Sequence, residues 1–154
     1  MKYRALLILL SLFIGFSSCE KDDDNDDSEQ LAKDIAVIED YLESNNIDAQ
    51  KTSSGLYYII TEEGTGLHPT INSTVTVQYK GKLLDGTIFD NNTATFRLTG
   101  VIAGWQEGIP LFKKGGRGKL FIPSGLGYGA GGTSDGSIPG NTVITFDIHL
   151  ISFY

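Results

Sequence analysis

Cysteine is almost absent from this sequence, since Cys19 is the only one among 154 residues. A single cysteine excludes an intrachain disulfide and any metal site built from several cysteines. Basic residues are also scarce, with 12 Lys and Arg against 19 Asp and Glu and a formal net charge of −7. The sequence therefore lacks the basic patch that would indicate binding to nucleic acid, and we expect no nucleic-acid partner.

The charge imbalance is confined to the first third of the chain. Residues 1–51 contain five basic and twelve acidic residues, whereas residues 52–154 contain seven of each. The later part is therefore electrostatically neutral, and the acidic part needs a separate explanation.

The chain also lacks the run of about 20 apolar residues that a membrane-spanning helix needs. Its longest apolar segment, residues 5–16, follows Lys2 and Arg4 and has the length of a signal-peptide core. That segment leads into Phe16-Ser17-Ser18-Cys19, which resembles a bacterial lipobox with Phe in place of the usual Leu.

We therefore expect residues 1–18 to be a lipoprotein signal peptide and Cys19 to be lipidated. An ordinary secretory signal with an incidental cysteine is the alternative. The expected location is outside the cytoplasm, on a bacterial membrane through the lipid anchor. The outer membrane is favoured, with the protein on its periplasmic or surface-facing side.

Residues 19–27 follow the cysteine and contain six Asp or Glu residues between Glu20 and Asp27. Such a segment cannot build a core, so we expect a solvated tether. It is either a plain linker or a surface-export signal, which it resembles because of its place directly after the anchor.

Residues 28–50 are expected to form an amphipathic helix, because Leu31, Ile35, Ile38 and Leu42 recur at helical spacing. A single short helix is marginal in water, so its apolar side needs a partner. The sequence leaves three roles open: packing on the following domain, pairing with another copy, or acting as a spacer.

Residues 51–154 alternate short β-type runs with turn signals. The predicted fold is α+β, with an antiparallel, curved sheet of roughly five strands wrapped around one short helix. The strands are predicted at residues 56–61, 74–84, 95–99, 118–123 and 142–154, the helix at 103–112, and a long glycine-rich loop at 124–140.

This domain shows no nucleophile–base pair, metal-ligand cluster or phosphate-binding loop. Large apolar side chains stand instead at strand ends, turns and loop tips, with one carboxylate among them. They are Tyr79, Phe89, Asp90, Phe96, Val101, Ile102, Trp105, Tyr128, Ile138 and Phe146.

Four segments carry a family resemblance: VQYKGKLLDGTIFD, FRLTGVIAGWQEGI, KLFIPSGLGYG and SIPGNTVITFDIHLISF. In their order and spacing they resemble the FKBP-type peptidyl-prolyl cis-trans isomerase domain, over residues 51–154. The resemblance implies an antiparallel sheet around a short helix, with a pocket between them. It also implies proline-containing polypeptides as substrates, the family's macrolide inhibitors as further ligands, and neither a cofactor nor a metal.

The resemblance further implies roles for the residues of the pocket. Trp105 forms its floor, and the Tyr128 hydroxyl and the Ile102 N–H bind substrate carbonyls. Asp90 lies near the twisted amide or orients Tyr79. The implied catalytic residues are Phe89, Asp90, Trp105 and Tyr128, and the implied substrate-binding residues are Tyr79, Phe96, Val101, Ile102, Ile138 and Phe146.

Two departures from the family pattern stand beside this pocket. Residues 91–95 are shorter than the corresponding segment of many members, and Gly100 stands where a hydrogen-bonding residue is frequent. We expect both to alter affinity and substrate preference while leaving floor and walls in place. The alternative function is a lipid-anchored chaperone or interaction module that binds proline-containing segments with little catalysis.

Overall fold

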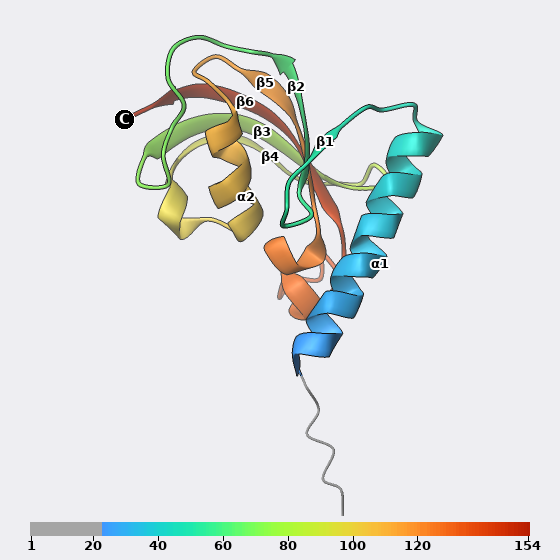
Figure 1. Ribbon diagram of the computed structural model, residues 1–154. Coiled ribbons are helices and arrows are strands. Elements are labelled where there is room, and N and C mark those ends of the chain that lie inside the picture. The colour runs from blue at the N-terminus through green and yellow to red at the C-terminus, as the bar shows by residue number, and fades with distance from the viewer. Residues whose placement is uncertain (1–22) are drawn as a thin grey trace, which may run out of the picture.

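The computed structural model describes residues 23–154, so the expected signal peptide, the lipidation site at Cys19 and the start of the acidic tether lie outside the described residues. A long helix is followed by a curved sheet that wraps around a second, short helix (Figure 1). The elements in chain order are α1 (Asp23–Ser44), β1 (Gln50–Lys51), β2 (Tyr57–Glu62), β3 (Thr74–Leu83), β4 (Ile88–Arg97), η1 (Leu98–Gly100), α2 (Ala103–Gly108), η2 (Ile109–Leu111), β5 (Arg117–Ile122), η3 (Ser124–Leu126), η4 (Gly129–Gly131) and β6 (Ile144–Phe153).

The sheet has six strands in the order β1-β2-β5-β6-β3-β4, and every neighbouring pair is antiparallel. This confirms the predicted α+β architecture of an antiparallel sheet around a short helix. The two-residue strand β1, which pairs with β2, was not predicted. It is too short to leave a periodic signal in the sequence.

Strand β4 differs from the sequence-based prediction. Residues 88–94, for which no strand was predicted, form one strand with residues 95–97, and this strand pairs with β3 from Thr74↔Arg97 to Lys82↔Ile88. The outermost strand of a sheet is free to extend along its neighbour, and the β-branched Thr93 and Thr95 favour this conformation. The pocket side chains Phe89 and Phe96 therefore lie on one continuous strand.

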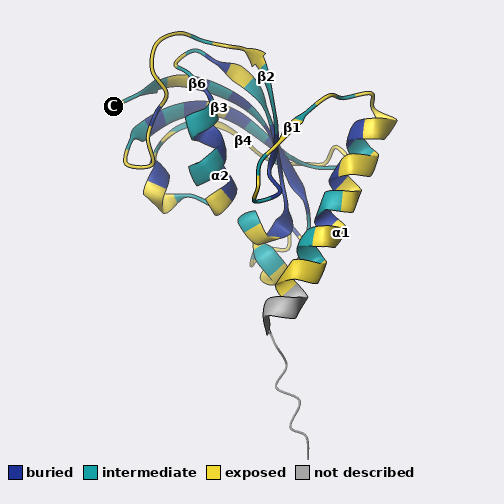
Figure 2. Cartoon of the chain, in the orientation of Figure 1, coloured by how far each residue is buried: buried dark blue, intermediate teal, exposed yellow. Residues whose placement is uncertain are grey.

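The main core lies between the sheet and α2. Alternate residues of β3 and β6 point toward this helix, as the two-residue period of the sequence predicts. Figure 2 shows buried positions along the strands and on the inner sides of both helices. The fully buried members of this core include Val75, Val77, Leu98, Ile109, Leu120, Ile122, Ile144 and Leu150.

Helix α1 packs on the opposite face of the sheet, which is the first of its three expected roles. Ile38 and Leu42 are buried against Tyr57 of β2 and Phe121 of β5. The helix starts at Asp23 rather than at Ser28, because carboxylates are favourable near a helix N-terminus. Among residues 23–154, no helix combines the length and the apolar composition that crossing a membrane requires.

The end of α1 is set by its asparagines. Asn46 adopts a left-handed backbone conformation with φ of 52°, and the Ile47 N–H donates to the Leu42 carbonyl over 2.9 Å. This arrangement satisfies carbonyls that a helix end leaves without partners. The helix therefore stops at Ser44, short of the predicted boundary at residue 50.

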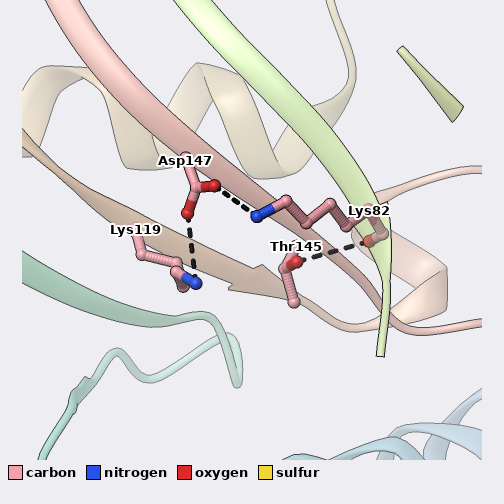
Figure 3. A network of polar contacts seen from close by, with 4 residues as sticks. All are labelled: Lys82, Lys119, Thr145 and Asp147. Carbon is pink, nitrogen blue, oxygen red and sulfur yellow. Dashed lines mark hydrogen bonds and ion pairs between the residues drawn. The ribbon is translucent and has the colours of Figure 1, made fainter. Parts of the chain in front are cut away.

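A polar network ties three strands together on the face of the sheet opposite α2 (Figure 3). Asp147 of β6 accepts a hydrogen bond from Lys82 of β3 over 2.7 Å and forms an ion pair with Lys119 of β5 over 3.1 Å. Burial alone would raise the pKa of Asp147, but the hydrogen bonds from the two lysines outweigh it and hold the pKa below 3.8. The Thr145 hydroxyl donates to the Lys82 carbonyl over 3.3 Å.

Gly118 allows β2 and β5 to approach closely. A Cβ atom at this position would lie 1.8 Å from the Ile59 carbonyl oxygen, which is backbone and cannot move without separating the strands. We expect Gly118→Ala to lower the free energy of unfolding by about 3 kcal/mol or more, at the upper end of overpacking effects.

Denaturant unfolding monitored by circular dichroism measures this change. Gly131→Ala is the matched control, because a Cβ atom there meets no other atom within 4 Å, and we expect a change below about 0.5 kcal/mol. Equal stability of the two variants would contradict the close approach of the strands.

Candidate active site

A pocket of about 260 Å³ opens between α2 and the strands β3, β4 and β6. It brings together residues that lie up to 67 positions apart, between Tyr79 and Phe146. Its lining residues are Tyr79, Phe89, Asp90, Phe96, Gly100, Val101, Ile102, Trp105, Tyr128 and Phe146. Nine of the ten residues singled out from the sequence are among them.

Helix α2, which carries Trp105, lies very close to the sheet. A Cβ atom on Gly104 would come within 2.5 Å of Ile122, and one on Gly108 within 2.7 Å of Leu120. The two glycines are four residues apart and so share the helix face that lies on β5. This close packing of α2 on β5 fixes the distance between the Trp105 indole and the strands.

Three aromatic rings hold the Trp105 indole in place. The rings of Tyr79, Phe96 and Phe146 meet it nearly at right angles, with centroid distances of 5.1, 5.5 and 5.1 Å. Edge-to-face pairs of this kind contribute about 0.5–1.5 kcal/mol each beyond their buried area. The indole is 4% exposed, and its Nε1 has no hydrogen-bond partner within residues 23–154.

One wall of the pocket depends on a missing side chain. Phe89 and Phe146 meet edge to face at 5.5 Å between centroids. A Cβ atom on Gly81 would lie 2.4 Å from the Phe89 ring and 2.8 Å from the Phe146 ring. Glycine at this position is therefore what lets the two rings close the pocket beside β3.

The polar groups of the pocket are few and connected. The Tyr79 hydroxyl donates to Oδ2 of Asp90 over 2.7 Å. Burial, followed by this hydrogen bond and the Asp90 charge, raises the pKa of Tyr79 to about 12. Burial and the same carboxylate also raise the pKa of Tyr128 above 10.0. Both phenols are therefore neutral hydrogen-bond donors at physiological pH.

The rim of the pocket is held by a residue that sequence reasoning missed. Gln106 of α2 donates through Nε2 to the Val101 carbonyl over 2.8 Å. The Val101 N–H donates to the Leu98 carbonyl over 3.4 Å, whereas within residues 23–154 the Ile102 N–H meets no backbone acceptor. A polar side chain in the first turn of a predicted helix is the signal that could have drawn attention to Gln106.

Ile138 differs from its predicted place in the pocket. It is 2% exposed and belongs to the main core, and it is not one of the pocket-lining residues. Its N–H donates to the Thr133 hydroxyl, and its carbonyl accepts from the Thr133 N–H, each over 2.9 Å. These bonds close residues 133–138 into a turn, so Ile138 anchors the long loop rather than lining the pocket.

Fold and site together define a class of protein. It is an α+β domain with a small aromatic pocket that is lined by neutral hydrogen-bond donors and one carboxylate. Comparison with known proteins then identifies the family. The family model of FKBP-type peptidyl-prolyl cis-trans isomerases matches residues 66–151. The chain belongs to this family.

Curated relatives agree with this assignment. The chain is 39% identical over 140 residues to the FKBP-type peptidyl-prolyl cis-trans isomerase FkpA of Escherichia coli K12. This alignment covers 88% of this chain and 50% of that protein. It is 43% identical over 104 residues to the outer membrane protein MIP of Legionella longbeachae, covering 64% of this chain and 44% of that protein. The chain thus spans half or less of the length of these relatives.

Solved structures share the fold. The crystal structure of FkpA from Escherichia coli superposes with a TM-score of 0.70 at 38% identity, covering 84% of this chain and 63% of that one. A peptidyl-prolyl cis-trans isomerase from Pseudomonas syringae superposes with a TM-score of 0.69 at 31% identity, covering 79% of this chain and 94% of that one.

Proposed function

We propose that this chain is a peptidyl-prolyl cis-trans isomerase that accelerates rotation about X–Pro bonds in proline-containing polypeptides outside the cytoplasm. The active unit is residues 51–154, with the pocket over Trp105 as its site. The observation that carries the proposal is the combination of an indole floor held by three rings with the Tyr79–Asp90 hydrogen bond. Family membership supports the same activity.

The chemistry of X–Pro rotation suits such a pocket. Twisting an amide out of its plane costs about 18–20 kcal/mol, because resonance is lost. The twisted amide is less polar than the planar one, so an apolar, water-poor pocket favours it over both planar isomers. No covalent bond breaks, so the pocket residues need only bind the proline ring on Trp105 and hold the carbonyls around the twisted bond.

The donors of the site fit this role. We assign the binding of substrate carbonyls to the Tyr128 hydroxyl and the Ile102 N–H, because both residues line the pocket. The Asp90 carboxylate accepts the hydrogen bond of the Tyr79 hydroxyl. We assign it one of two roles, to orient that hydroxyl or to place its charge near the twisted amide.

Activity is expected to change by less than about twofold between about pH 7 and about pH 9. The pKa of Tyr79 is about 12 and that of Tyr128 lies above 10.0, so neither donor titrates in this range. His149, whose pKa burial lowers below 6.5, does not line the pocket and is already neutral there. Initial isomerisation rates across the pH series measure this, and a steep change in kcat/KM would reveal another titrating group in the site.

The raised pKa values of the two tyrosines also predict the pH range in which alkali destabilises the fold. A phenol whose folded-state pKa is raised stabilises the fold below its unfolded pKa of about 10. That stabilisation is lost as the pH rises from about 10 through the folded-state pKa of Tyr79 near 12. The melting temperature should therefore fall in this alkaline range.

The proposed anchor is a lipid on Cys19, after removal of residues 1–18. The apolar segment followed by Ser17-Ser18-Cys19 supports it, and a similar protein is named an outer membrane protein. Metabolic labelling with a fatty-acid analogue should mark the wild-type chain and leave Cys19→Ala unmarked. Equal labelling of the two chains, or no labelling of the wild type, would contradict lipidation at this residue.

An isomerisation assay with a panel of short X–Pro peptides tests the activity. The full chain in mild detergent should increase the cis-to-trans rate of at least some peptides in proportion to enzyme concentration. The Asp40→Asn variant is a suitable control, because Asp40 lies on the exposed side of α1 and should leave the rate unchanged. An uncatalysed rate for every peptide would refute the proposed function.

A further inference from the structure

A buried carboxylate outside the pocket connects α1 to the segment that carries Tyr128. Asp34 of α1 is 3% exposed. Its Oδ2 accepts hydrogen bonds from the Ser124 N–H over 2.7 Å and from the Ser124 hydroxyl over 2.6 Å. Its Oδ1 accepts from Gln30 Nε2 over 2.8 Å.

No ion pair found within residues 23–154 includes Asp34. A buried carboxylate without a cation depends on its hydrogen bonds to offset the loss of hydration. The three donors therefore hold the side chain in one geometry, and the two on Ser124 in turn fix that residue. Charge-assisted hydrogen bonds of this length are the strong ones.

Ser124 stands at the start of the tight turns that lead to the pocket. The Leu126 N–H donates to the Pro123 carbonyl over 3.0 Å, and the Gly127 N–H donates to the Ser124 carbonyl over 2.9 Å. Tyr128 follows directly and lines the pocket. A displacement of Ser124 is therefore carried along a short, hydrogen-bonded segment to the phenol.

A second set of contacts leads from α1 to the floor of the pocket. Leu31 and Ile35 lie against Gly55, where a Cβ atom would be 3.0 and 3.3 Å from their Cδ1 atoms. The neighbouring Ser54 hydroxyl donates to Oε2 of Glu107 over 2.7 Å, and Glu107 belongs to α2, the helix of Trp105. Figure 1 shows α1 alongside both the segment after β5 and the turn before β2.

We propose that Asp34 is a positioning residue of the isomerase site, which acts through Ser124 to place the Tyr128 hydroxyl at the substrate carbonyl. This inference rests on the proposed function. It also gives α1, which lies outside the matched family region, a role in the activity. The apolar contacts of Ile38 and Leu42 hold α1 on the sheet without Asp34, so the effect of replacing Asp34 is local to the Ser124–Tyr128 segment.

The test is a double-mutant cycle on the full chain with X–Pro peptides. Asp34→Asn keeps the shape of the side chain and removes its charge, and we expect kcat/KM to fall about tenfold. In a Tyr128→Phe background, where no hydroxyl remains to be placed, the same substitution should change kcat/KM by less than about twofold. Asp40→Asn, the control on the exposed side of the same helix, should change neither.

Ser124→Ala provides a second variant in case Asp34→Asn unfolds. It removes the hydroxyl donor and keeps the backbone donor, so it should give a smaller loss that also disappears in the Tyr128→Phe background. Thermal melting shows which variants are folded at the assay temperature.

The outcomes separate the two claims. Wild-type activity for folded Asp34→Asn, or an equal loss with and without the Tyr128 hydroxyl, would overturn the positioning role and leave the isomerase proposal standing. A wild-type chain without isomerase activity would refute the proposed function itself, and the role of Asp34 with it.

Discussion

Replacing Trp105 by alanine is expected to lower kcat/KM by about a hundredfold and to lower the free energy of unfolding by about 3–5 kcal/mol. The indole is 4% exposed and contacts three rings, so its removal opens a cavity in the core and removes the pocket floor together. Trp105→Leu keeps part of the apolar surface and should lose less of both. Peptide isomerisation kinetics and denaturant unfolding measure the two effects on the same preparations.

Phe112→Leu is the matched control for this experiment. Phe112 is 1% exposed in the same core but does not line the pocket. It should lose stability while the folded protein keeps its activity, whereas Trp105→Leu should lose activity beyond what the folded fraction explains. If Trp105→Leu isomerises as well as Phe112→Leu, then Trp105 is an ordinary core residue.

Replacing Asp90 by valine is expected to lower kcat/KM about tenfold or more while the melting temperature changes little. Asp90 is exposed at the pocket mouth and accepts the hydrogen bond of the Tyr79 hydroxyl, so its loss affects the site more than the core. Asp90→Asn should give a smaller decrease, because the amide oxygen still accepts a hydrogen bond but the charge is gone. Steady-state kinetics with a melting curve for each variant measures the separation.

Asp85→Ala is the control that distinguishes a pocket role from a turn role. Asp85 stands in the turn between β3 and β4, where its carboxylate accepts the Thr87 N–H over 2.8 Å. We expect this variant to lose stability with unchanged kcat/KM, the reverse of Asp90→Val. An Asp90→Val protein that melts early yet isomerises normally would show that Asp90 only supports the strand.

Tyr79→Phe tests how Asp90 acts. If the carboxylate works by orienting the Tyr79 hydroxyl, the double variant Tyr79→Phe with Asp90→Val should be no worse than the more damaged single variant. If the losses in kcat/KM of the two single variants multiply in the double variant, the Asp90 charge contributes on its own.

The local features of the fold could be predicted from the sequence because they depend on short-range patterns. The alternation of Val75, Val77 and Tyr79 predicts a strand with one buried face, and the structure confirms it. Helical spacing likewise predicts α1, although its start differs because the helix dipole favours the acidic residues ahead of Ser28.

Features that depend on long-range packing could not be predicted in this way. The Asp34–Ser124 contact joins residues 90 positions apart, and neither residue carries a local signal for the other. Ile138 was assigned to the pocket by resemblance, yet the folding of residues 133–138 buries it in the core. The continuous strand β4 depends on its pairing with β3, which the residues of β4 alone do not show.

The pocket itself lies between these two cases. The family resemblance assigned nine of its lining residues to one pocket, and the structure places all nine around one cavity. Gly81 was not singled out, because the reason for its glycine lies in two phenylalanine rings that come from β4 and β6. Residue type shows which side chains suit an apolar ligand, and the fold shows which of them meet.

The most direct test of the proposed activity is exchange spectroscopy on an X–Pro peptide at equilibrium. Cross-peaks between the cis and trans forms report the rate of rotation, while titration of Trp105 fluorescence reports binding to the same pocket. A substoichiometric amount of the chain should raise the exchange rate in proportion to its concentration and leave the cis-to-trans ratio unchanged, and Trp105→Ala should abolish most of the increase. Binding that quenches Trp105 fluorescence while exchange stays at the uncatalysed rate would contradict the account and show a module that holds proline segments without catalysis.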